Sequence, residues 1–105
     1  MTESEWKILR TVKEAALERH CGRILDECQA VIQGSGTNHE RYLRLFETVE
    51  NGDNQIAWAF NDLRRSVADE RLAFMVKLGV VTDEELGRFS EETRERTRLI
   101  LGLLR

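Results

Sequence analysis

The sequence contains no proline, the residue that most strongly interrupts helices. Its absence over 105 residues permits long helices. No segment alternates apolar and polar residues as a half-buried β-strand does. Hydrophobic residues make up 41% of the chain and charged residues 33%, so the chain can form a core and is unlike a disordered segment. We therefore predict an all-α fold with one helical domain over residues 1–105.

Long apolar runs and a large excess of either charge are also missing. The longest apolar run, residues 99–104, is too short to span a membrane. The first five residues are acidic and carry no apolar segment, which argues against a signal peptide. The net charge of −3 argues against a general nucleic-acid binder. We expect a cytoplasmic protein whose partners include neither nucleic acid nor a membrane.

Cysteine is scarce, with only Cys21 and Cys28 in the chain. Seven residues along one helix would separate these two by about 10.5 Å. A disulfide requires Cα atoms within roughly 7 Å. We therefore expect two free thiols, both on the buried face of the first helix as small apolar residues.

That first helix is predicted from Glu3 to Gln33, with Thr2 and Glu5 as a capping box. Gly22 lies inside it and marks either a kink or the close approach of another helix. A helix of this size is about 45 Å long, whereas a compact globule of this chain length is about 33 Å across. Either the helix is broken at Gly22, or the molecule is an elongated bundle whose overhang is covered by a second copy.

Two more helices are predicted after the first. Thr37 and Glu40 form a second capping box at the start of a short helix, and the polar residues 51–54 predict its end. A third helix is then expected over Ile56–Leu78. Its apolar stripe comprises Ile56, Phe60, Leu63, Val67, Phe74 and Leu78. The alternative is one unbroken helix from residue 38 to residue 78.

A clear turn follows Leu78. Gly79 suits a left-handed residue just beyond a helix end, with Val80 folding back towards Met75. Thr82 and Glu85 form a third capping box and begin the last helix. The inward stripe of that helix comprises Leu86, Phe89, Thr93, Thr97, Ile100 and Leu104. The chain is therefore predicted to fold as an elongated antiparallel bundle of about four helices.

Catalytic and metal-binding patterns fail in this sequence. Di-iron bundles need Glu-x-x-His pairs, but Leu17 and Gly36 stand three residues before His20 and His39. Zinc proteases need two histidines four residues apart, and the residue four after His39 is Leu43. We therefore expect no metal and no cofactor, and we favour a protein without enzymatic activity. The alternative left open is an enzyme with carboxylate chemistry, which would require two acidic side chains that converge in a pocket.

Two arginines and a tryptophan of the third predicted helix are candidate binding residues. Arg71 lies within the apolar arc, with Arg64 one heptad before it. A buried guanidinium needs a partner, so Arg71 either pairs with a glutamate, extends to solvent, or joins Arg64 in an anion site. Trp58 lies opposite Phe60, where it is either covered by another helix or serves as an interface anchor.

The C-terminal segment is apolar on almost every side, unlike a surface helix with one apolar stripe. Exposed apolar patches on monomers are usually small, so this end is predicted to lie in an interface. The residues proposed for that interface are Leu99, Leu101, Leu103 and Leu104. We predict a non-catalytic helical interaction or regulatory protein that forms a homodimer or binds another helical protein. The alternative is a small-ligand or anion-binding module that uses Arg71 and Arg64.

Overall fold

The computed structural model describes residues 1–104, and its longest element is α1 (Glu3–Gln33). The Thr2 hydroxyl accepts a hydrogen bond from the Glu5 N–H at 3.2 Å, which satisfies one free donor of the first turn. The predicted bounds of this helix are confirmed, but only half of the predicted capping box forms, because the Glu5 carboxylate binds Ser90 and Thr93 instead of the Thr2 backbone. It continues through Gly22, where an added Cβ would meet nothing within 4 Å, so no other helix comes close there. The molecule is elongated as predicted, 52 × 24 × 22 Å.

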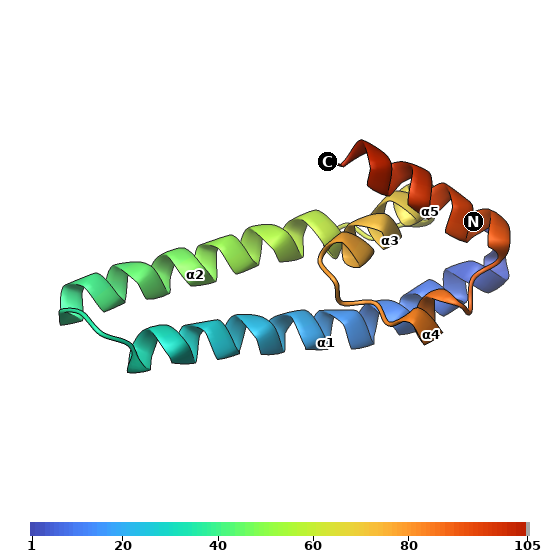
Figure 1. The fold of residues 1–105 in the computed structure, drawn as a ribbon. Helices are drawn as coiled ribbons and strands as arrows, with labels where there is room; N and C mark the ends of the chain where they lie inside the picture. The colour runs from blue at the N-terminus through green and yellow to red at the C-terminus, as the bar shows by residue number, and fades with distance from the viewer. Residues whose placement is uncertain (105) are drawn as a thin grey trace.

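Helix α2 (Asn38–Ala59) runs antiparallel to α1 and forms a long hairpin with it (Figure 1). The predicted capping box is confirmed, because Thr37 accepts from the Glu40 N–H at 3.1 Å and Glu40 accepts from Thr37. The predicted break at residues 51–54 is wrong. Gly52 is buried within α2, where the Ile24 side chain of α1 occupies the space that a larger residue would need.

The helix predicted over Ile56–Leu78 is also wrong, because the chain turns at residues 60–64. Asp62 adopts a φ of 55°, a left-handed conformation that aspartate tolerates better than most residues. A short 3₁₀ helix η1 (Arg65–Val67) then leads into α3 (Ala68–Lys77). The alternative of one helix over 38–78 is right as far as Ala59 and wrong beyond it.

The turn after α3 is confirmed in detail. Gly79 has a φ of 74°, and its N–H donates to the Val76 carbonyl at 2.9 Å. The Val80 N–H reaches back to the Met75 carbonyl at 3.3 Å, which completes the expected helix end. Arg23 of α1 donates to the Leu78 and Gly79 carbonyls, at 2.8 and 2.6 Å. The turn is therefore held by its own backbone and by α1.

We predict that Gly79→Val lowers the free energy of unfolding by more than 1 kcal/mol, because a β-branched residue is strained at positive φ. Thr82→Ala should cost about 1 kcal/mol through loss of the next helix cap. Urea unfolding followed by circular dichroism measures both changes. An unchanged midpoint for Gly79→Val would contradict the role given to this turn.

The last predicted helix is in fact two helices. Helix α4 covers only Asp83–Leu86, with Thr82 and Glu85 forming the predicted capping box. The chain then turns, and the Ser90 hydroxyl caps α5 (Glu91–Leu103) by accepting from the Thr93 N–H. The continuous stripe from Leu86 is therefore wrong, although Thr93 does face inward and is fully buried.

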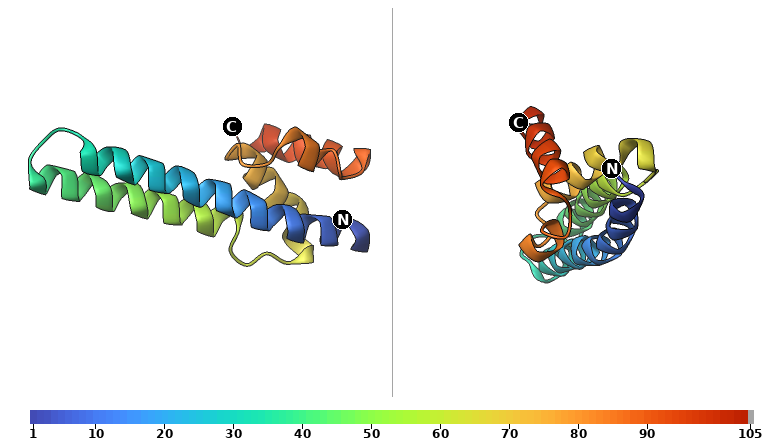
Figure 2. Two further views of the ribbon diagram at one scale, coloured as in Figure 1. Left: turned by 90° about the horizontal axis from the view of Figure 1, so that it is seen from below. Right: turned by 90° about the vertical axis from the view of Figure 1, so that its right-hand side faces the viewer.

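Helices α3, α4 and α5 pack around the N-terminal half of α1 and the C-terminal end of α2, and leave the rest of the hairpin projecting (Figures 1 and 2). All-α architecture with about four substantial antiparallel helices is confirmed. The hydrophobic core at this end comprises Leu9, Val12, Ala16, Ala59, Phe60, Ala68, Leu72, Phe74, Met75, Val80 and Phe89.

A buried carboxylate joins α1 to α5. Glu5 accepts from the Ser90 N–H at 2.9 Å and from the Thr93 hydroxyl at 2.6 Å. Burial raises the pKa of this carboxyl, but the hydrogen bonds from Ser90 and Thr93 outweigh burial and lower the pKa to about 2. The charged form of Glu5 therefore stabilises the attachment of α5.

A second buried carboxylate joins α4 to α1. The Arg19 guanidinium donates to both oxygens of Glu85, at 2.6 and 3.0 Å, and also to the Val80 carbonyl at 2.8 Å. The hydrogen bond from Arg19 is the main cause that lowers the pKa of Glu85 to about 2. The sequence analysis treated both acids only as cap residues, so it missed their tertiary partners.

Candidate interaction surface

Residues 1–104 contain no group of three or more His, Cys, Asp or Glu side chains placed to hold a metal ion. Cys21 is half-buried and Cys28 is buried, and both thiols are free. The prediction of free thiols is confirmed, but Cys21 is less buried than expected. Over the same described range, every helix is too short or too polar to cross a membrane.

Contrary to the prediction from the sequence, Arg64 and Arg71 do not lie on one face of the same helix. Arg64 is exposed in the connection before η1 and pairs with Asp62 at 2.9 Å. Arg71 lies on α3 with its guanidinium carbon 5.7 Å from the centre of the Phe74 ring. Its buried Nε has no hydrogen-bond partner among the described residues. Because the chain turns between them, the two arginines belong to different elements.

Trp58 packs against α3. Its ring stacks on that of Phe74 with centroids 4.2 Å apart, so Arg71, Phe74 and Trp58 form a partly buried stack. Another helix therefore covers part of Trp58, as one of the two alternatives predicted. A further role of the indole in an interface stays a prediction.

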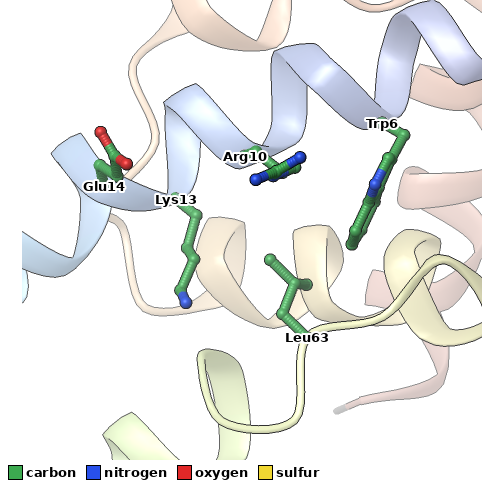
Figure 3. Close-up of a pocket in the computed structure, with 5 residues that line it drawn as sticks. All are labelled: Trp6, Arg10, Lys13, Glu14 and Leu63. Atoms are coloured by element: carbon green, nitrogen blue, oxygen red, sulfur yellow. The ribbon is translucent and has the colours of Figure 1, made fainter.

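A shallow groove of about 230 Å³ lies between α1 and the connection after α2. Trp6 and Leu63 supply its apolar lining. Arg10 lies between Trp6 and Lys13 along α1, and Glu14 lines the end of the groove farther from Trp6 (Figure 3). Neither Arg10 nor Lys13 forms an ion pair with any described residue. The groove therefore offers two cations to an anionic group, and the Glu14 carboxylate also lines it. The sequence analysis did not identify it, because Leu63 was assigned to a helix.

The C-terminal leucines differ from one another in exposure. Leu99 and Leu103, which lie one helical turn apart on α5, are 67% and 84% exposed. Leu101 is half-buried, and Leu104 packs against the edge of the core. The predicted apolar surface at this end therefore consists mainly of Leu99 and Leu103. Its role in an interface stays a prediction.

A larger apolar surface lies on the projecting part of the hairpin. On α2, Tyr42, Phe46 and Val49 follow one another at helical spacing and are all at least half exposed. Asp53 continues the same row towards the base of the hairpin. No described element covers these three side chains.

Helix α1 carries a matching row beside it. Cys21, Leu25, Cys28 and Ile32 have the same spacing, and Leu25 and Ile32 are 68% and 53% exposed. Two grooves between the helices join the rows. The groove at the base is lined by Cys21, Ile24, Leu25, Val49, Asp53 and Ile56. The groove near the tip is lined by Ile32, Asn38, Arg41, Tyr42 and Leu45.

We refer to these two rows together as the hairpin face. The opposite side of the hairpin is more polar, with a groove near the tip lined by Ala30, Val31, Gly34, Ser35 and Arg44. Apolar surface is therefore concentrated on one side of the projecting hairpin. A helix pair that exposes one apolar side is typical of a segment that binds another helical element.

No protein-family model matches this chain, and no curated protein or solved structure matches it either.

Proposed function

We propose that this chain is a non-catalytic interaction protein that acts as a homodimer. The observation that carries this proposal is the exposed apolar hairpin face, which extends away from the packed end of the molecule (Figure 2). Exposed apolar patches of this kind on a folded chain mark interaction sites. A homodimer is the simplest assembly that supplies a second apolar helix pair.

The mass of the protein in solution tests this proposal. Light scattering over a range of concentrations should approach twice the chain mass of 12.2 kDa. Circular dichroism on the same samples should show a helical protein. A mass that stays at 12.2 kDa up to several hundred micromolar would contradict self-association. Because the two free thiols suit a reducing compartment, we also propose a cytoplasmic location.

Binding of a small anionic ligand is the second candidate function, favoured by the Trp6 groove rather than by Arg64 and Arg71. Arg10 supplies a cation next to Trp6, and Lys13 supplies a second cation farther along the groove, beside Glu14 (Figure 3). Benzoate combines a carboxylate with an aromatic ring and is a suitable probe. Calorimetry should detect millimolar binding that Arg10→Ala with Lys13→Ala abolishes. Equal heats for both proteins would contradict this function.

A further inference from the structure

We infer that the hairpin face docks onto the same face of a second copy in antiparallel orientation, so that two hairpins form a four-helix bundle. This inference rests on the proposed homodimer and assigns its surface and its geometry. Two exposed apolar surfaces are candidates for the dimer interface. One is the hairpin face, and the other is the C-terminal pair Leu99 and Leu103.

The area of the hairpin face favours it over the C-terminal pair. A stable interface buries about 800 Å² on each partner, of which about 60% is apolar. Aromatic side chains bury roughly 150–250 Å² each, so a half-exposed Tyr or Phe presents about 100 Å², and a half-exposed Leu, Ile or Val presents less. The half-exposed side chains of the hairpin face are Leu25, Ile32, Tyr42, Phe46 and Val49. Together they present on the order of 400 Å², which is close to this requirement, whereas two leucines fall far below it.

The shape of the hairpin also suits a second copy. The two rows run along adjacent helices with the grooves between them, so the face is a two-helix layer with one apolar side. Helices pack by inserting side-chain ridges into the grooves of another helix. An identical layer supplies such ridges from Phe46 and Leu25, and the pair then has the architecture of an antiparallel four-helix bundle.

Charge along the face determines the orientation. Asp53 lines the groove at the base of the hairpin, and Arg41 lines the groove near the tip. A parallel pair would place Asp53 against Asp53 and Arg41 against Arg41. An antiparallel pair places each Arg41 near Asp53 of the other copy, where opposite charges favour association.

The spacing of these charges places the two-fold axis. Twelve residues of α2 separate Arg41 from Asp53, about 18 Å along the helix. The midpoint of that interval falls next to Phe46, so Phe46 lies at the axis and contacts its own symmetry mate. A central aromatic residue with a polar rim is a common arrangement for a stable interface.

The surface is tested by adding charge on either side of the hairpin. Leu25→Glu with Phe46→Glu places one carboxylate on each row of the face. Ala30→Glu with Asn51→Glu is the matched control, because both residues are exposed and Ala30 lines the opposite groove. Sedimentation equilibrium should show a folded monomer for the first variant, with the dimer dissociation constant raised at least about 100-fold. The control should remain a dimer.

The C-terminal surface provides the competing outcome. Leu99→Glu with Leu103→Glu should leave the dimer intact. A dimer that survives charge on the hairpin face but dissociates in this C-terminal variant would overturn the inference while the proposed homodimer stands. A wild-type monomer would instead contradict the homodimer itself. Thermal unfolding of each variant confirms that a monomer is folded.

The orientation is tested by reversing charges. In an antiparallel dimer, Asp53→Arg and Arg41→Asp each place like charges together and should weaken association about tenfold or more. The double variant should return the dimer dissociation constant to within about threefold of the wild-type value, since residues 41 and 53 of the two copies again carry opposite charges. In a parallel dimer the single and double variants would all associate like the wild type, because like charges face each other in every case. That result would overturn the antiparallel arrangement.

Discussion

The free energy of unfolding should fall steeply between pH 5 and pH 2. Glu5 and Glu85 each have a pKa of about 2 in the folded chain, against an ordinary value of 4.5. A carboxyl whose pKa is lowered by folding stabilises the protein fully above its unfolded pKa. This stabilisation is lost as the pH falls from 4.5 through the folded value, because the unfolded chain takes up the proton first.

The size of this effect follows from the same pKa difference. At about 1.4 kcal/mol per pH unit, each carboxylate contributes at most about 3 kcal/mol at neutral pH. A single-domain protein typically has only about 5–15 kcal/mol of stability in total. Loss of both contributions near pH 2 should therefore leave little or no stable folded protein. Urea unfolding at constant protein concentration, repeated from pH 8 to pH 2, measures this dependence.

Neutral substitutions assign the effect to the two carboxylates. Glu5→Gln and Glu85→Gln should each lower stability at pH 7 by up to about 3 kcal/mol, and the difference from wild type should vanish near pH 2. Glu3→Gln is the control, because its exposed pair with Arg65 should contribute less than about 1 kcal/mol. Equal wild-type stability at pH 3 and pH 7 would contradict the role given to Glu5 and Glu85.

Gly52→Leu should destabilise the hairpin by about 3 kcal/mol through overpacking. A Cβ added at Gly52 would lie 2.6 Å from Cδ1 and 2.8 Å from Cγ1 of Ile24. Both distances are below normal carbon contact, so the Ile24 side chain must move from the position it occupies against α2. Gly22→Ala is the control, because its Cβ meets nothing within 4 Å and should stabilise the helix by about 1 kcal/mol.

A double-mutant cycle separates overpacking from a simple effect on helix propensity. Gly52→Ala alone should destabilise, because its contact with Ile24 outweighs the gain of about 1 kcal/mol in helix propensity. In an Ile24→Ala background the contact is gone, so Gly52→Ala should become stabilising by about 1 kcal/mol. Chemical denaturation of the wild type, the two single variants and the double variant gives the coupling free energy between positions 24 and 52. If Gly52→Ala changes the free energy of unfolding with the same sign in both backgrounds, Ile24 does not require glycine at position 52.

Features that depend on neighbouring residues were determined by the sequence itself. The helix starts at Thr2, Thr37 and Thr82 were predicted correctly, because a cap is formed by residues within three positions of one another. The turn at Gly79 was predicted for the same reason. Helical periodicity and the absence of proline were enough to predict the all-α class and the elongated shape of the bundle.

The sequence alone could not predict where the second helix ends, because tertiary contacts decide that position. Asn51 to Asn54 and the pair Asn61 and Asp62 both favour a turn, so local propensity could not choose between them. Packing of Ile24 against Gly52 keeps the first site helical, and Asp62 takes the left-handed conformation at the second. Because the chain turns there, Arg64 precedes η1 and Arg71 lies on α3, so the two arginines do not share the predicted helix face.

Long-range pairing also decided which side chains are buried. Glu5 meets Ser90 and Thr93, and Glu85 meets Arg19, at separations of 66 to 88 residues along the chain. No local pattern specifies such partners. The exposure of the apolar rows on the hairpin was not predicted from the sequence. Whether an apolar helix face becomes core or surface depends on which elements reach it, and α3, α4 and α5 all pack at the other end of the hairpin.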